Sequence, residues 1–468
     1  MQTECSRGQL AFEDFCGRKV VTAFDGGDIT SNAGALLLRE VDRIIGLSDQ
    51  VAACFTDTRD QDSVVHSLRT LVGQRIHGIA LGYEDLNDHD TLRHDGVLGL
   101  LSDTLAPKRK DCAVLAGKST LNRLERSASK VTLNERYHKF SLDEKALERV
   151  FVELFLAAHQ QPPEAIIIDL DSTDDPLHGD QEGKFFHGYY GGYCYLPLYI
   201  FCGRELLAAK LRTANIDGAA CSVEEIMRIV RQIREKWPDV AIELRADSGF
   251  CRDELMAWCE VNGVGYVFGL ARNSRLCELA APAMAEARRR ARQSGKAERV
   301  YTEFTYRTHD SWSCERRVIA KAEYLPGKEI GEGKTNFRFI VTARKRIAFE
   351  GQEIYEQVYC ARGEMENRIK ECQLDLFADR TSTATLKSNQ LRLWFASLAY
   401  VLVNALRRLA LAGTNLARAT VGTIRLKLMK IGALVIKSVR RIKVAMACGC
   451  PYATEFEAAR KRLRTRAA

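Results

Sequence analysis

Acidic side chains stand where a fold can bring them together. Asp169 and Asp171 end an apolar stretch typical of a strand, and Asp247 ends another. Glu366 lies early in a predicted helix over 363–377. A spacing of two places Asp169 and Asp171 on the same face of a strand. Because strand ends and a covering helix can converge at one edge of a sheet, we expect a carboxylate cluster there.

Such a cluster predicts metal-dependent chemistry. Clustered carboxylates repel one another, and one becomes protonated unless a cation holds them. Oxygen ligands select Mg²⁺ or Mn²⁺. Two such ions, about 3.5–4 Å apart, would activate an attacking oxygen and stabilise the leaving 3′ oxygen of a phosphodiester.

The residues around Glu366 recur at three- and four-residue steps, which place them on one face of a helix. They are Tyr359, Arg362, Glu366, Lys370 and Gln373. A carboxylate flanked by Arg and Lys suits a DNA end, with the cations on phosphates. The alternative is an exposed helix with ordinary ion pairs.

The charge distribution also indicates a polyanionic partner. The chain has 468 residues and a net charge of +8. From Arg418 to the end, thirteen Lys and Arg face two acids, and this tail includes Arg440 and Arg441. Alternation of cations with apolar residues favours nucleic-acid contact over a merely solvated face.

A turn at Gly117 followed by a short helix with Ser119 as its cap resembles the element that a helix-turn-helix protein places in a major groove. Asn122 and Arg123 would contact DNA there. One more surface helix is the alternative.

An aromatic run lies shortly after the first acids. Phe185, Phe186, Tyr189, Tyr190, Tyr193 and Tyr195 alternate with Lys184, His187 and glycines. The run could line DNA near the first acid, or it could be packing within a hairpin. Trp258 is a further candidate for stacking on a flipped base, although a core tryptophan is the more ordinary role.

The order of elements predicts an α/β protein. Residues 18 to 160 have mostly helical patterns, for example over 33–44 and 64–81. Strands are expected over 165–168, 193–201, 206–211, 241–246 and 265–270, and an antiparallel β insert over 299–346. This order suggests a mixed sheet with helices on its faces. The expected regions are 1–160 (helical, DNA-binding), 161–270 and 356–412 (catalytic core), 271–355 (β-rich insertion) and 413–468 (basic).

Together these motifs resemble a known family. Tyr359, Arg362 and Glu366 fit the Tyr–x2–Arg–x3–Glu–x6–Lys signature of one branch of the DDE transposases, although Gln373 stands at the position of the terminal Lys. The segments 24–38, 82–93, 169–198 and 362–371 are similar to the thirteen-eighty group of bacterial insertion sequences.

The resemblance implies a ribonuclease H-like core with Asp171, Asp247 and Glu366 as catalytic residues and metal ligands, and with Asp169 as the alternative first acid. It also implies that Lys370 contacts phosphate in place of the missing Lys. Such an enzyme binds the inverted repeats of its own element, cleaves their 3′ ends and joins them to target DNA, with two Mg²⁺ or Mn²⁺ ions. A dimer is expected when two ends are held together.

Three alternatives stay open. The stretch from Ala165 to Thr173 matches the hhhh-D-x-D-x-T motif of haloacid dehalogenase-type phosphatases, with Asp169 as nucleophile. That class expects an acidic loop after a later strand, and Cys251 stands there instead. The others are a DNA-binding derivative without catalysis and a nuclease without joining activity.

The sequence favours the bacterial cytoplasm, in association with the nucleoid. Charged residues interrupt the start before any apolar stretch, so no signal peptide is expected. The longest uncharged apolar run, 393–406, is short for a membrane span, and the fifteen cysteines show no metal-binding or disulfide pattern.

Overall fold

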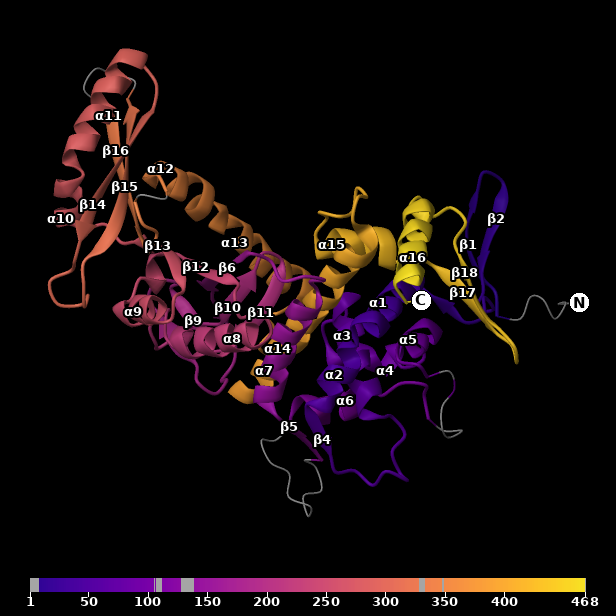
Figure 1. The fold of residues 1–468 in the computed structure, drawn as a ribbon. Coiled ribbons are helices and arrows are strands. Elements are labelled where there is room, and N and C mark those ends of the chain that lie inside the picture. The colour runs from indigo at the N-terminus through magenta and orange to yellow at the C-terminus, as the bar shows by residue number, and fades with distance from the viewer. Residues whose placement is uncertain are drawn as a thin grey trace, which may run out of the picture. The chain divides into compact units, whose positions relative to one another are not determined.

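The computed structural model describes residues 8–104, 106, 112–127, 139–327, 333–346 and 349–467. The chain forms two compact units (Figure 1). The first contains residues 1–143, 375–377 and 398–468, and the second contains residues 144–374 and 378–397. The predicted catalytic acids all belong to the second unit.

The second unit is built on an eight-stranded mixed sheet, whose strands follow the order β11-β10-β6-β12-β13-β16-β15-β14. β6 pairs in parallel with β12, and β12 with β13, whereas the other neighbours are antiparallel. The predicted mixed α/β architecture is therefore confirmed. In chain order the strands are β6 (Ala165–Ser172), β10 (Leu198–Cys202), β11 (Glu205–Lys210), β12 (Ala241–Ala246), β13 (Gly265–Leu270), β14 (Glu298–Tyr306), β15 (Arg316–Pro326) and β16 (Gly333–Thr342).

The two faces of this sheet bury different side chains. Ile166, Ile168 and Leu170 of β6 point into the main apolar core, as strand alternation requires. Helices cover that face, and a second helical layer lies on the other (Figure 1). The helices of the main core are α7 (Glu144–Ala157), α8 (Ser222–Lys236) and α9 (Asp253–Val261).

An irregular helical segment covers the opposite face. Ile354 and Tyr355 pack there against Val267 and Ile340. The segment changes its winding around the predicted site residues, as helices often do at functional positions. It consists of α12 (Gly351–Glu353), a π-helical stretch (Ile354–Tyr359), a 3₁₀ turn (Cys360–Arg362), α13 (Gly363–Lys370) and a second π-helical stretch (Glu371–Asp375).

Two strand predictions differ from the structure. The expected strand 193–201 is two strands, because β9 (Gly192–Tyr195) belongs to a separate three-stranded sheet and β10 begins after Pro197. The strands of the expected β insertion extend the core sheet, since β16 pairs with β13. The helices α10 (Ser274–Leu279) and α11 (Ala281–Ser294) connect β13 to these strands, and α11 packs on β14 and β15.

The first unit is mainly helical. Ser67 caps α3 by accepting a hydrogen bond from the Thr70 amide, and Gly46 ends α1 in a left-handed conformation (φ 65°). The helices of the N-terminal part are α1 (Leu36–Ile45), α2 (Leu47–Ala53), α3 (Leu68–Ala80), α4 (His89–Leu92), α5 (Gly96–Leu101) and α6 (Lys118–Glu125). The expected cap of the last helix is wrong, because α6 begins at Lys118 with Gly117, and not Ser119, at the cap position.

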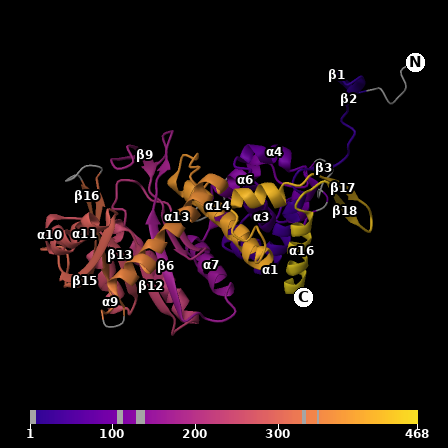
Figure 2. The ribbon, with the colours of Figure 1, turned by 90° about the horizontal axis from the view of Figure 1, so that it is seen from above.

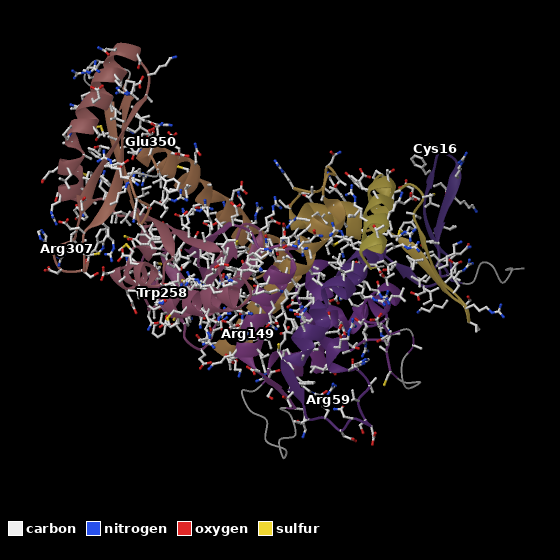
Figure 3. The ribbon with its side chains drawn as sticks, viewed as in Figure 1. Cys16, Arg59, Arg149, Trp258, Arg307 and Glu350 are labelled. Carbon is white, nitrogen blue, oxygen red and sulfur yellow. The ribbon has the colours of Figure 1, made fainter. Side chains whose placement is uncertain are left out.

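The predicted helical region also contains strands. The hairpin of β1 (Leu10–Phe15) and β2 (Arg18–Thr22) is exposed along its length, with Cys16 at its turn (Figure 3). β4 (Phe55–Asp57) pairs with β5 (Phe140–Leu142). In the basic tail, α15 (Val421–Ile424) precedes β17 (Ala433–Lys437) and β18 (Ile442–Met446), which form a sheet with β3 (Ile29–Thr30), and α16 (Ala453–Ala467) follows.

The long helix α14 (Leu386–Leu406) continues into a π-helical stretch, Arg407–Leu411. By length and composition alone, Leu386–Leu411 could cross a membrane, and within the described residues it is the one such helix. In its most apolar stretch 94% of the residues are buried inside the protein, and a core helix passes the same test.

Candidate active site

The register of the central strands brings the predicted acids to one edge of the sheet. Arg245 of β12 lies opposite Asp169 of β6, and Ala246 lies opposite Leu170. One further residue along both strands places Asp247 beside Asp171. Asp169 and Asp171 also share a face, as their spacing predicts, because both bind arginines that contact or lie on the irregular helical segment.

Asp169 is committed to a buried ion pair. Its two carboxylate oxygens accept hydrogen bonds from Arg245 Nε and Nη2 at 2.6 and 2.8 Å, and the residue is 3% exposed. Arg245 Nη1 donates to the Val358 carbonyl at 2.7 Å and thereby fixes the helical segment above the strand. A nucleophilic carboxylate needs access to its substrate, so this arrangement argues against the phosphatase alternative.

Asp171 has a different environment, in which one arginine joins two acids. Arg362 Nη1 lies 3.3 Å from Asp171 Oδ2, and Arg362 Nη2 lies 2.9 Å from Glu366 Oε1. The side chain of Asp171 is 16% exposed and that of Glu366 is 47% exposed. The irregular helical segment therefore brings Arg362 and Glu366, one helical turn apart, to the end of β6.

Burial and neighbouring charges shift the ionisation of Asp171 and Arg362. Burial raises the pKa of Asp171 to about 6, and the negative charges of Asp247 and Glu366 contribute, whereas Arg362 opposes the shift. Burial also disfavours the charged Arg362, but Asp171 and its neighbours outweigh this effect and raise the pKa of Arg362. Mutual carboxylate repulsion of this kind is what a bound cation relieves.

Tyr359 packs over the backbone beside the second acid. A Cβ on Gly269 would lie 2.6 Å from Tyr359 Oη and 2.8 Å from the Ser248 nitrogen, so only glycine fits there. Burial raises the pKa of Tyr359, with Arg362 opposing and Asp247 contributing. Asp247 Oδ1 accepts a hydrogen bond from the Gly249 amide at 2.8 Å, which orients its carboxylate.

The donor set fits divalent cations. Asp171, Asp247 and Glu366 provide carboxylate oxygens within one electrostatically coupled site. Among the described residues, no three acidic, His or Cys side chains are gathered closely enough to ligate an ion as they stand. Arg362 occupies the space between two of the donors, so ion binding requires its guanidinium to move away.

Gln373 and Lys370 have different surroundings. Gln373 Nε2 donates to the Asp174 carbonyl and to Asp175 Oδ1, both at 3.0 Å, so the residue at the signature Lys position faces the segment that follows the first acid. Lys370 is exposed. Its predicted phosphate contact stays a prediction.

The other predicted DNA contacts lie on several surfaces. Asn122 and Arg123 are exposed on α6, and Arg440 and Arg441 are exposed between β17 and β18, all in the first unit. Lys184 belongs to the second unit, where its Nζ lies 3.4 Å from Asp180 Oδ1. Their roles stay predictions. Trp258 of α9 packs partly buried against the main core (Figure 3) and lies on the opposite side of the sheet from the irregular helical segment.

Sequence reasoning missed Arg245, Gly269 and Asp175. Arg245 carried a usable signal, because it precedes Asp247 by two residues and must share its face of the strand. Gly269 is a lone glycine within an apolar strand, which marks a close approach of another group. Nothing in the sequence pattern marks Asp175 as buried.

Comparison with known proteins assigns the chain to a family. The sequence matches the family described as "Transposase DDE domain group 1" over residues 12–468. No curated protein matches the chain. A solved structure of a piggyBac transposase synaptic complex with hairpin DNA is similar, with 10% identity, a TM-score of 0.40, and coverage of 85% of this chain and 79% of that chain. Because the family match spans nearly the whole sequence, the chain belongs to the DDE transposase domain family.

Proposed function

From its membership of the DDE transposase family, we propose that this chain is the transposase of a bacterial insertion sequence of the thirteen-eighty group. It binds the terminal inverted repeats of its own element, cleaves their 3′ ends by hydrolysis and joins these ends to target DNA. Its partner is therefore DNA, and it acts as a dimer that holds two ends together. It works in the cytoplasm, at the nucleoid.

The observation that carries this proposal is that Arg362 joins Asp171 and Glu366 at the sheet edge where Asp247 follows the neighbouring strand β12. The three acids come from two strands and a helix that are far apart in sequence, and Arg362 contacts two of them. We propose all three as catalytic residues and metal ligands, with Asp169 in a supporting position. The core strands β11, β10, β6, β12 and β13, covered by helices, support a ribonuclease H-like fold.

DDE transposases use divalent metal ions, and Mg²⁺ or Mn²⁺ would activate the attacking oxygen and stabilise the leaving 3′ oxygen. Asp171, Asp247 and Glu366 would hold the two ions. Arg362, released from the carboxylates, is positioned to donate two hydrogen bonds to a phosphate, which guanidinium geometry favours. Tyr359, held over Gly269, orients the start of this helix beside Asp247.

The remaining regions would position the DNA. We propose that residues 1–160, with Asn122 and Arg123, recognise the ends, and that the tail 413–468, with Arg440 and Arg441, binds phosphates. Lys184, Tyr359 and Lys370 would contact the strand near the acids. Because phosphate contacts release counterions, Arg440→Ala with Arg441→Ala should lower the salt dependence of end binding, whereas an unchanged dependence would remove these residues from the interface.

The direct test compares Glu366→Gln with wild type on DNA that carries the element ends, in Mn²⁺, scoring 3′-end cleavage and joining. Glu364→Gln is the matched control, because Glu364 lies on the same helix and pairs with Arg368 rather than with Arg362. Loss of both products only in Glu366→Gln supports the proposal. Equal cleavage by both variants would contradict it, and cleavage without joining by wild type would indicate a nuclease.

A further inference from the structure

A hairpin in the second unit exposes aromatic side chains that the proposed chemistry does not use. It consists of β8 (Phe185–His187), a turn and β9 (Gly192–Tyr195). Tyr189 is 87% exposed, and Phe186 and Tyr193 are more than half exposed. Single exposed apolar residues are normal, but several aromatic rings gathered on one ribbon mark a binding surface.

The rings meet edge to face and are not stacked on one another. Phe186 and Tyr193 meet edge to face at 5.6 Å, and Tyr189 and Tyr190 do so at 5.0 Å. Edge-to-face contact leaves ring faces available, whereas face-to-face stacking within the hairpin would cover them. Lys184 Nζ lies 4.9 Å from the centre of the Tyr193 ring and adds one cation to the surface.

The glycines of the hairpin leave open space beside these rings. A side chain added at Gly188, Gly191 or Gly192 would meet no atom within 4 Å. The turn of the hairpin is therefore not covered by other protein atoms at these three glycines. Gly191 also has a φ of 68°, which makes the turn and favours glycine.

The hairpin leaves the sheet at the first catalytic acid. β9 leads directly into β10, where Tyr199 lies opposite Asp171. Tyr195 of β9 pairs with Asp175, four residues after Asp171. Burial, followed by the negative charges of Asp174 and Asp171, raises the pKa of Tyr190 to about 12, as expected for a group near these acids. Figure 2 shows β9 standing out from the sheet.

The base of the hairpin is fixed to the protein. The Glu182 amide donates to the Ala384 carbonyl at 2.8 Å, and Glu182 Oε2 accepts from the Leu386 amide at 3.0 Å. Tyr195 Oη donates to the Glu182 carbonyl at 2.5 Å. The aromatic tip is therefore held in a defined place relative to Asp171, as a substrate-binding element must be.

We propose that this aromatic hairpin stacks on unpaired nucleobases of the DNA strand whose phosphodiester lies at the acids. The inference rests on the proposed function and deepens it by naming the form of DNA that the site takes. A surface for duplex phosphates would be rich in cations, but this one has exposed rings, a single lysine paired with Asp180, and Asp174 nearby. Stacking is sequence-tolerant, because every base has a flat face.

The test measures binding of a fluorescent oligothymidylate by the full-length protein and its double variant Phe186→Ala with Tyr189→Ala. We expect the variant to bind roughly fivefold or more weakly, while binding of a duplex of the same length changes little. A 2-aminopurine in the single strand should lose fluorescence on wild type, because its base becomes stacked, and should keep it on the variant.

Three further variants keep the result decisive. Tyr189→Phe preserves a flat ring and should bind like wild type, whereas Tyr189→Leu preserves apolar area and should bind weakly. Val261→Ala removes an equally exposed apolar side chain from α9 and should have no effect. Equal binding by wild type and the double variant, full binding by Tyr189→Leu, or no binding of single strands by wild type would each overturn the proposal.

Failure of this proposal can be told apart from failure of the proposed function. Single-strand binding needs no cleavage, so Asp171→Asn should retain it. If Asp171→Asn loses cleavage while the hairpin variants bind single strands as wild type does, the transposase function stands and only the role of the hairpin fails. If wild type binds single strands through the hairpin but never cleaves, the role of the hairpin stands and the transposase function fails.

Discussion

Two acids on one strand show how the position of a carboxylate along the strand determines its arginine partner and its exposure to solvent. Asp169 and Asp171 lie on the same face of β6, and each is bound by an arginine. Arg245, from the neighbouring strand, encloses Asp169 in the interior, whereas Arg362, from the helical segment, meets Asp171 at the sheet edge. The side chains of the interior pair are 4–9% exposed, and those of the edge pair are 16–19% exposed.

The difference teaches that an ion pair can serve either packing or chemistry. The Asp169–Arg245 pair has two short bonds and a third to the Val358 carbonyl, so it cannot change partners without breaking the fold. The Asp171–Arg362 contact is longer, at 3.3 Å, and is shared with Glu366. A shared, partly exposed contact can open for a ligand.

The largest expected effect is a difference in cleavage activity between variants of the two acids. Asp171→Asn should lower 3′-end cleavage by about a thousandfold or more, because it removes a proposed metal ligand. Asp169→Asn should retain cleavage within about tenfold per folded molecule, because the amide still fills the same space. Cleavage assays on the two variants measure this, with the folded fraction determined by circular dichroism. The reverse order of activities would make Asp169 the first catalytic acid.

The next effect is a difference in the free energy of unfolding between variants of the two arginines. Arg245→Met should lower the free energy of unfolding by about 3–5 kcal/mol, because it leaves the buried Asp169 without its partner. Arg362→Met should lower it less, by about 1–2 kcal/mol, because that contact is longer and its side chains are 16–19% exposed. Urea denaturation of both variants at neutral pH, without metal, checks the contrast. Equal losses would mean that the edge pair is as structural as the interior one.

The pH dependence should sharpen the comparison further. The pKa of Asp171 is raised from 3.8 to about 6, so its ionised form opposes folding above that range. In the absence of metal, Asp171→Asn should therefore gain up to roughly 3 kcal/mol of stability at pH 7. The gain should shrink as the pH falls through 6 and vanish below about pH 3, where the wild-type carboxyl is protonated in both states.

Urea denaturation of wild type and Asp171→Asn across this pH range measures that gain. A gain that is independent of pH would show that the substitution acts through packing. A loss of stability at pH 7 would show that Arg362 holds the carboxylate more strongly than burial opposes it.

The strands and the common face of the two acids could be predicted from the sequence. Their arginine partners could not, for a physical reason. The strands at 241–246 and 265–270 have clear apolar patterns and are confirmed with the same limits. The common face of Asp169 and Asp171 follows from strand alternation alone. The arginine partner of each acid does not follow from strand alternation. Arg245 and Arg362 come from elements whose register and winding depend on tertiary contacts.

The irregular helix illustrates the same limit. Uniform helical steps placed Tyr359, Arg362, Glu366, Lys370 and Gln373 on one face. The structure changes its winding at Ile354–Tyr359, at Cys360–Arg362 and again at Glu371–Asp375. Gln373 thereby turns to Asp174 and Asp175 while Lys370 stays exposed. Local propensity does not report such changes, because they arise from packing against the sheet.

The smallest expected effect concerns this glutamine. Asp175 is fully buried, and burial, although opposed by the Gln373 hydrogen bond, raises its pKa well above the usual range. Gln373 Nε2 is a neutral donor to both the Asp174 carbonyl and Asp175 Oδ1, and it ties the segment after Asp171 to the irregular helical segment. Gln373→Ala should cost about 1–2 kcal/mol of unfolding free energy through the lost hydrogen bonds.

Gln373→Lys distinguishes this role from that of the lysine in the family signature. Gln373→Lys would bury an ammonium group where a neutral amide now donates two hydrogen bonds, so we expect a stability loss of about 1 kcal/mol or more and no gain in cleavage. Denaturation and cleavage assays on Gln373→Lys, with Lys370→Gln as the companion variant, measure both. A rise in cleavage with Gln373→Lys would mean that the site lacks a phosphate contact. Unchanged cleavage, together with a fall in Lys370→Gln, would place that contact one helical turn earlier.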